Sequence, residues 1–127
     1  MKREARMTIT GIAHIQLAML AGGEPQARAF YGGLLGMPEI AKPESLAGRG
    51  GCWFRAGAQE VHMGIEPEVG RFRRHPALLT DGLDALRAVL VAEGVGIEED
   101  EQIPGFRRVY ARDPFGNRVE FLEPLGA

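Results

Sequence analysis

The sequence has little cysteine, no long apolar run and no surplus of positive charge. Its single cysteine, Cys52, has no partner for an internal disulfide, which favours a reducing compartment, and we expect the cytoplasm. No segment approaches the roughly 18 consecutive apolar residues of a membrane-spanning helix. Fifteen Lys and Arg stand against 17 Asp and Glu, so the basic excess typical of nucleic-acid-binding proteins is missing. We therefore expect neither a membrane nor a nucleic acid as partner.

Glycine and proline, by contrast, are frequent, and they divide the chain into short segments. There are 18 glycines and 8 prolines. Residues 9–19 alternate between apolar and polar side chains, which predicts a strand. Residues 25–36 and 83–93 have apolar residues at helical spacing and are predicted helices. Further short strands are predicted at residues 38–41, 52–55, 59–66, 75–80, 95–99, 106–112 and 118–122.

The predicted elements follow the order βαβββ twice, which indicates two copies of one supersecondary unit. We predict an N-terminal lead-in at residues 1–8, a first module at 9–66, an inter-module loop at 67–74 and a second module at 75–124. A four-stranded sheet with a single helix leaves one face uncovered, so each module needs a partner. The predicted fold is therefore α+β, with tandem βαβββ modules forming a curved eight-stranded cradle and the helices on its outside.

The three histidines and one glutamate occupy matching positions in the two modules. His14 opens the first strand of the first module, and His75 opens the first strand of the second. His62 lies on the last strand of the first module, where the second module has Glu120. On each strand the neighbours of these residues are apolar, so the alternation of side chains places all four on the face away from the helices. We expect them to face the concave side, where the modules meet.

Imidazole and carboxylate groups together suit zinc, nickel, manganese, iron or cobalt. We predict one divalent metal held by His14, His75 and Glu120, joined by His62. Three or four protein ligands leave coordination positions open for water or a chelating substrate, which is typical of a catalytic metal site. The alternative is that each histidine is satisfied by its surroundings and binds no metal.

Several of these segments resemble the vicinal oxygen chelate superfamily, which includes glyoxalase I, fosfomycin-resistance transferases, bleomycin-resistance proteins and extradiol dioxygenases. The matching stretches are residues 11–15 (GIAHI), 30–37 (FYGGLLGM), 60–64 (EVHMG) and 113–121 (DPFGNRVEF). The resemblance covers nearly the whole chain after residue 8 and is more specific for the fold than for any one reaction.

The resemblance implies a metal at His14, His62, His75 and Glu120, with a substrate bound to it through two neighbouring oxygens. Lyase, isomerase, transferase and oxygenase reactions all occur in the superfamily. Carboxylates are the implied catalytic bases, here Glu120 or Glu60. Each module supplies two ligands, so two modules must face each other, either within one chain or across a homodimer; we favour a homodimer with two equivalent sites. The residues expected to line the substrate pocket are Gln16, Trp53, Arg108, Tyr110 and Arg112.

Two departures keep the reaction open. His62 stands where glyoxalase I usually has a glutamate, and Glu60 is displaced from that position by two residues. Gln16 stands where similar fosfomycin transferases carry a threonine. A non-catalytic drug-binding or metabolite-binding protein similar to the bleomycin-resistance proteins is the alternative function, with aromatic side chains such as Trp53 as its binding surface.

Overall fold

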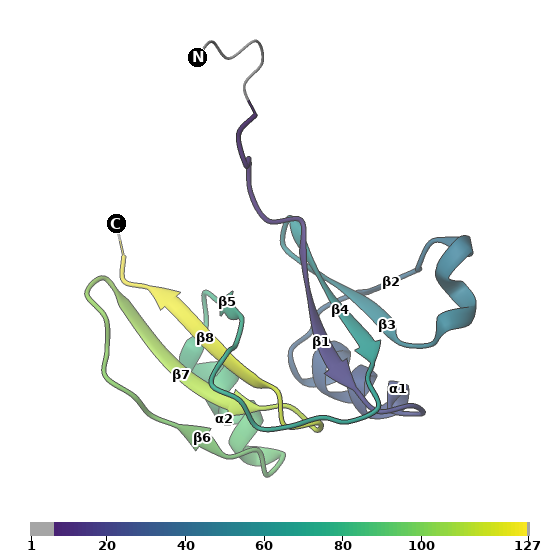
Figure 1. Ribbon diagram of the computed structural model, residues 1–127. Helices are drawn as coiled ribbons and strands as arrows, with labels where there is room; N and C mark the ends of the chain where they lie inside the picture. The colour runs from purple at the N-terminus through teal and green to yellow at the C-terminus, as the bar shows by residue number, and fades with distance from the viewer. Residues whose placement is uncertain (1–6, 127) are drawn as a thin grey trace.

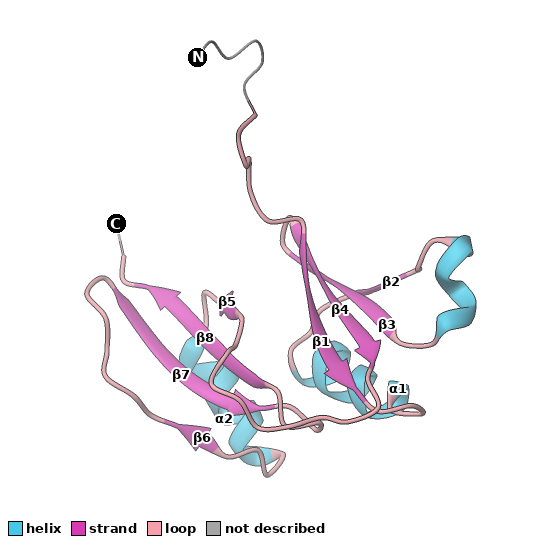
Figure 2. Cartoon of the chain, in the orientation of Figure 1, coloured by secondary structure: helices cyan, strands magenta, loops and turns pink. Residues whose placement is uncertain are grey.

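The computed structural model describes residues 7–126, so most of the predicted lead-in at residues 1–8 lies outside the described residues. The chain folds into two four-stranded sheets with a few short helices (Figures 1 and 2). No helix within residues 7–126 is both long and apolar enough to cross a membrane. The elements of the first half are β1 (His14–Met19), α1 (Glu24–Ala27), the π-helical η1 (Arg28–Leu34), β2 (Glu39–Ile40), the 3₁₀ helix η2 (Glu44–Arg49), β3 (Cys52–Ala56) and β4 (Gln59–Ile65). Those of the second half are β5 (Ala77–Leu79), α2 (Leu83–Ala92), β6 (Ile97–Glu98), β7 (Phe106–Arg112) and β8 (Arg118–Pro124).

The two sheets have the same topology. Their strand orders are β1-β4-β3-β2 and β5-β8-β7-β6. In each, the first strand of the module pairs in parallel with the last, and the remaining pairs are antiparallel. The predicted α+β class and the tandem βαβββ modules are confirmed. Within the chain the eight strands form two separately hydrogen-bonded sheets, whose free edges include β1 and β5.

Several elements are shorter than predicted. The strand predicted from residue 9 begins at His14, because its partner β4 begins at Gln59 and offers no backbone groups beyond that point. Strand β5 begins after Pro76, which has no N–H to donate to a ladder. The first predicted helix is a single α-turn that continues as a π-helix containing Gly32 and Gly33, two poor α-helix formers. The 3₁₀ helix η2 was not predicted.

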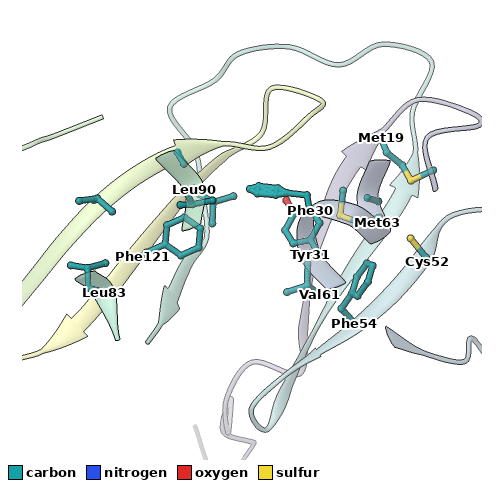
Figure 3. Close-up of a cluster of buried hydrophobic side chains, with 14 residues drawn as sticks. Met19, Phe30, Tyr31, Cys52, Phe54, Val61, Met63, Leu83, Leu90 and Phe121 are labelled. Carbon is teal, nitrogen blue, oxygen red and sulfur yellow. The ribbon is translucent and has the colours of Figure 1, made fainter. Parts of the chain in front are cut away.

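The helices pack against one face of each sheet and bury the apolar side of the strands. Val61 and Met63 of β4, and Phe121 of β8, are no more than 2 % exposed. Phe30 from η1 and Leu90 from α2 approach each other where the two modules meet (Figure 3). Because side chains alternate along a strand, burying this face directs the polar residues of β4, β7 and β8 to the opposite face.

A buried polar cluster joins the two modules at the turn between β7 and β8. The Tyr31 hydroxyl donates to Asp113 Oδ2 at 2.6 Å. Asp113 Oδ1 accepts the backbone N–H groups of Phe115 and Asn117 at 2.9 and 2.8 Å. The Asn117 side-chain amide donates to the Ala18 carbonyl at 2.7 Å. The Asp-Pro-Phe-Gly-Asn turn therefore connects β1 and η1 of the first module to β7 and β8 of the second.

Candidate metal site

The structure places the four predicted ligands in two pairs, one on each sheet. The imidazole rings of His14 and His62 stack with their centroids 4.1 Å apart. On the other sheet, His75 Nε2 lies 2.9 Å from Glu120 Oε1. Among residues 7–126, no three His, Cys, Asp or Glu side chains lie close enough together to hold a metal ion. One chain therefore contains two half-sites and does not bring all four groups together.

The ring of His75 is oriented by a backbone carbonyl just before β5. Its Nδ1 donates to the Arg73 carbonyl oxygen at 2.7 Å, which fixes the hydrogen of a neutral ring on Nδ1. The lone pair of Nε2 then faces a carboxylate oxygen of Glu120, which can only accept. Two acceptors at this distance need a cation between them, either a proton or a metal ion. A ring whose other nitrogen donates to a carbonyl is the usual arrangement of a metal-binding histidine.

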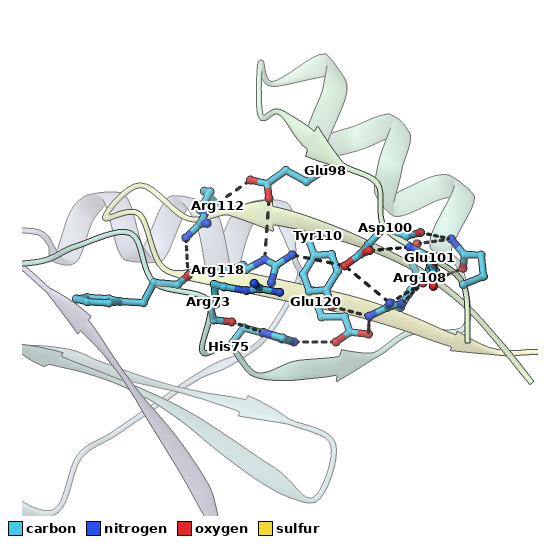
Figure 4. A network of polar contacts seen from close by, with 12 residues as sticks. Arg73, His75, Glu98, Asp100, Glu101, Arg108, Tyr110, Arg112, Arg118 and Glu120 are labelled. Atoms are coloured by element: carbon cyan, nitrogen blue, oxygen red, sulfur yellow. Dashed lines mark hydrogen bonds and ion pairs between the residues drawn. The ribbon is translucent and has the colours of Figure 1, made fainter. Parts of the chain in front are cut away.

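Glu120 is buried (6 % exposed) at the centre of a polar network on the open face of the second sheet (Figure 4). One guanidinium nitrogen of Arg108 lies 3.3 Å from Glu120 Oε2 and 2.5 Å from the Tyr110 hydroxyl. Tyr110 is the cross-strand neighbour of Glu120, and its ring meets the His75 ring in a T-shaped arrangement. Burial and the nearby Glu120 carboxylate raise the pKa of Tyr110 above its ordinary value.

The first sheet carries the other predicted pocket residues. Trp53 of β3 stacks on His62, and Glu60 Oε1 lies 2.8 Å from His62 Nε2. Gln16 of β1 lies over Gly64, where a Cβ would be only 2.5 Å from the Gln16 amide nitrogen. Gly64 therefore leaves the room in which the Gln16 side chain rests.

Arg112, predicted to line the substrate pocket, binds backbone carbonyls, and Arg118 was not among the predicted site residues. Arg112 donates to the carbonyl oxygens of Phe72 and Gly116, both at 3.1 Å, and so ties the inter-module loop to the β7–β8 turn. The guanidinium of Arg118 lies 3.7 Å from the centroid of the Tyr110 ring, and its Nε is buried without a hydrogen-bond partner. Strand parity could have found it, because Arg118 precedes Glu120 by two residues and shares its face.

An open hollow of about 990 Å³ lies between β1 and β5, the free edges of the two sheets. His14 and Glu60 line it from the first module and His75 from the second, and apolar side chains such as Leu78 and Phe121 complete its walls. One residue of each half-site, His14 and His75, therefore borders a space that the chain itself does not fill.

The sequence matches a family model over residues 11–121, that of the glyoxalase/bleomycin resistance protein/dioxygenase superfamily. The chain belongs to this superfamily. The match spans both modules, including all four residues of the half-sites. A comparison with solved structures also indicates the glyoxalase superfamily. A glyoxalase family protein from Bacillus anthracis is 45% identical, with a TM-score of 0.88 over 95% of this chain and 100% of that one.

More distant solved structures share the fold. A glyoxalase/dioxygenase from Nostoc punctiforme is 21% identical, with a TM-score of 0.76 and coverage of 97% of this chain and 100% of that one. Lactoylglutathione lyase from Agrobacterium tumefaciens is 22% identical, with a TM-score of 0.72 and coverage of 91% and 95%. A search of functionally curated proteins finds no match.

Proposed function

We propose that this member of the glyoxalase superfamily is a metal-dependent enzyme that binds a small oxygenated substrate through two vicinal oxygens. The observation that carries the proposal is the His75–Glu120 pair. The Arg73 carbonyl fixes the His75 ring so that Nε2 and a carboxylate oxygen face each other at 2.9 Å, an arrangement that either a proton or a metal ion can bridge. Imidazole and carboxylate ligands suit Zn, Ni, Mn, Fe or Co.

The complete site lies between two copies of the chain in this proposal, each copy giving one half-site to each of two metals. His14 and His62 are on one sheet and His75 and Glu120 on the other, and within one chain they remain apart. Strands β1 and β5 each have one unpaired edge beside the hollow, and a second copy would cover exposed strand edges. A cytoplasmic homodimer is the proposed working form.

When bound, the metal would act as a Lewis acid that stabilises negative charge developing on the substrate oxygens. The residues around the metal would supply a base and a positive charge. Glu60, with a half-buried side chain, can accept a proton as general base. Arg108, beside Glu120 and Tyr110, offers a guanidinium to a substrate carboxylate or phosphonate.

The alternative function, binding of a drug or metabolite without catalysis, depends on free aromatic surfaces. The Trp53 ring is covered on one face by His62 at 3.6 Å between centroids. The Tyr110 ring is covered on one face by Arg118 and touched at an angle by His75. Both rings are thus already in contact with charged or polar neighbours, which favours the metal-dependent function.

The proposal is tested by metal analysis of the purified protein and by calorimetric titration with Mn²⁺, Ni²⁺ and Zn²⁺. Glu120→Gln should weaken binding strongly, because it removes the carboxylate of the half-site. Glu99→Gln is the matched control, since Glu99 lies at the surface and pairs with Arg87. The loaded protein would then be assayed with methylglyoxal–thiol adducts, catechols and epoxide phosphonates. A wild-type protein that binds none of these metals contradicts the proposal, as does tight substrate binding that chelators leave unchanged.

A further inference from the structure

His62 lies between two flat rings on the open face of the first sheet. The indole of Trp53 is stacked on one side, with centroids 3.6 Å apart and planes within 3° of each other. The imidazole of His14 is stacked on the other side, at 4.1 Å and 15°. His62 itself is 4 % exposed, whereas His14 is exposed at the edge strand. The three rings form a column that ends at the candidate ligand His14.

The strand register explains this column. Trp53 is the cross-strand neighbour of His62 on β3, so the two rings lie side by side. On β1 the residue opposite His62 is Gln16, but its side chain lies over Gly64, which has no side chain of its own. The ring surface of His62 is thereby left open to His14, two residues earlier on β1. A larger residue at position 64 would compete with Gln16 for this space.

Nε2 faces a carboxylate oxygen in both His62 and His75, but within residues 7–126 only His75 also has its Nδ1 bonded to a backbone carbonyl. His62 Nε2 is 2.8 Å from Glu60 Oε1, and Glu60 is the register partner of His14. Turning the His62 imidazole toward a metal would break this contact and unstack both neighbouring rings. Aromatic stacking contributes about 0.5–1.5 kcal/mol for each pair beyond the area that it buries.

We infer that His62 is a positioning residue that fixes the ring of His14 for metal binding and is not itself a metal ligand. The inference rests on the proposed metal-dependent function and narrows its ligand set to His14, His75 and Glu120. Trp53 and Glu60 hold the His62 ring in place, and His62 in turn offers a fixed flat surface to His14. Position 62 then requires an aromatic ring, and the imidazole nitrogens of His62 are dispensable for metal affinity.

Calorimetric titration of dimeric protein with Mn²⁺ and Ni²⁺ separates the two roles. His62→Phe keeps a ring between Trp53 and His14 but has no nitrogen, so its metal affinity should stay within about threefold of wild type. His62→Ala removes the ring and should lower affinity by about tenfold, the effect expected when the support of a ligand is lost. His14→Ala removes a ligand and should lower affinity further than either.

Trp53 provides an independent test, because an indole cannot replace a ligand in this set. Trp53→Ala should weaken metal binding by roughly the same factor as His62→Ala, whereas Trp53→Phe should bind nearly as wild type. This pair decides the question if His62→Phe does not fold. Circular dichroism and urea unfolding verify that each variant is folded.

The outcomes separate failure of the inference from failure of the proposed function. If wild type binds metal but His62→Phe is as weak as His14→Ala, His62 is a ligand and the inference is wrong. If His62→Ala or Trp53→Ala binds as wild type, the ring column has no role in positioning and the inference is also wrong. If wild type binds no divalent metal, the proposed function itself fails.

Discussion

Cys52, the only cysteine, lies at the start of β3 and is 2 % exposed. Burial raises the pKa of its thiol from 9.0 to about 11, because the thiolate would lose its hydration among apolar neighbours. At neutral pH the side chain is therefore a protonated thiol, which is a poor nucleophile and a poor metal ligand. This agrees with a candidate site made of imidazole and carboxylate groups alone.

The raised pKa of Cys52 predicts a pH dependence of stability. Above about pH 9 the unfolded chain loses the thiol proton while the folded chain retains it up to about pH 11, so the free energy of unfolding falls as pH rises through this window. The loss from this group reaches about 2–3 kcal/mol, at roughly 1.4 kcal/mol per pKa unit. Below pH 8 the contribution is complete.

Cys52→Ala should lack this pH-dependent contribution. Urea unfolding at pH 7.5, 9.0 and 10.5 under reducing conditions should show the wild type losing its stability advantage over Cys52→Ala as pH rises. The other titrating groups are the same in both proteins, so the difference between the two curves reports the thiol. A difference that is constant over this range contradicts a raised thiol pKa.

At the same scale, the faces of the site residues could be predicted from sequence, but their orientations could not. The period-two alternation along each strand places Tyr110 and Glu120 opposite their apolar neighbours and requires no knowledge of the rest of the chain. The ring of His75 is oriented by the Arg73 carbonyl, which belongs to a loop without periodicity. The column of Trp53, His62 and His14 depends on the β1–β4–β3 register, which the sequence alone does not specify.

Among the elements, β3 depends on a glycine at its beginning. Gly51 has φ of 80°, a left-handed conformation that only glycine adopts readily. A Cβ at this position would lie 2.2 Å from the Met63 carbonyl oxygen of the neighbouring strand β4. Gly57, in the turn between β3 and β4, has φ of 61° but nothing within 4 Å of an added Cβ. The two glycines thus share a backbone conformation and differ in the space around them.

Comparison of Gly51→Ala with Gly57→Ala separates backbone strain from steric clash. Gly57→Ala should lower the free energy of unfolding by about 1–2 kcal/mol, the cost of a left-handed alanine. Gly51→Ala should cost clearly more, because the backbone of β3 or β4 must also move. Urea unfolding of both variants measures this, and equal losses would show that β3 has room to shift. Since Trp53 follows Gly51 by two residues, its fluorescence should change in Gly51→Ala and remain unchanged in Gly57→Ala.

The boundaries of a strand were predictable where the neighbouring strand pairs with it along its whole length. Strand β7 spans the predicted residues Phe106–Arg112, because it pairs along its whole length with β8. The strand predicted from residue 9 is shorter because its parallel partner β4 begins only at Gln59, so its length depends on the pairing and not on its own sequence. The bond between Asp113, in the turn after β7, and Tyr31, 82 residues away, was not predictable from local sequence.

For the whole molecule, the internal repeat predicts that equivalent residues lie at equivalent places in each module. It leaves open which modules face each other, because the repeat is the same whether the partners belong to one chain or to two. The bonds of Tyr31 with Asp113 and of Asn117 with Ala18 hold the two modules of one chain together in an arrangement that keeps their half-sites apart. This arrangement favours a site completed by a second copy.

A mixing experiment with two defective variants distinguishes the two cases. His14→Ala and His75→Ala should each bind metal much more weakly than wild type as homodimers, since every site then lacks one ligand. Refolded together, the two variants form mixed dimers. In a mixed dimer one shared site receives both mutations, and the other receives His14 from one copy and His75 from its partner. Metal binding should therefore return in the mixture.

Random association makes half of the dimers mixed, each with one intact site, so about one quarter of the wild-type capacity should be recovered. Calorimetric titration with Mn²⁺ measures the number of sites, and the separately refolded variants are the control. A site formed within one chain gives a different result, because each chain of the mixture still carries a defect and no capacity returns. Zero recovery in a mixture shown to contain mixed dimers would thus place the metal within a single chain. The two modules of that chain would then have to close on each other by breaking the contacts that Tyr31 and Asn117 make.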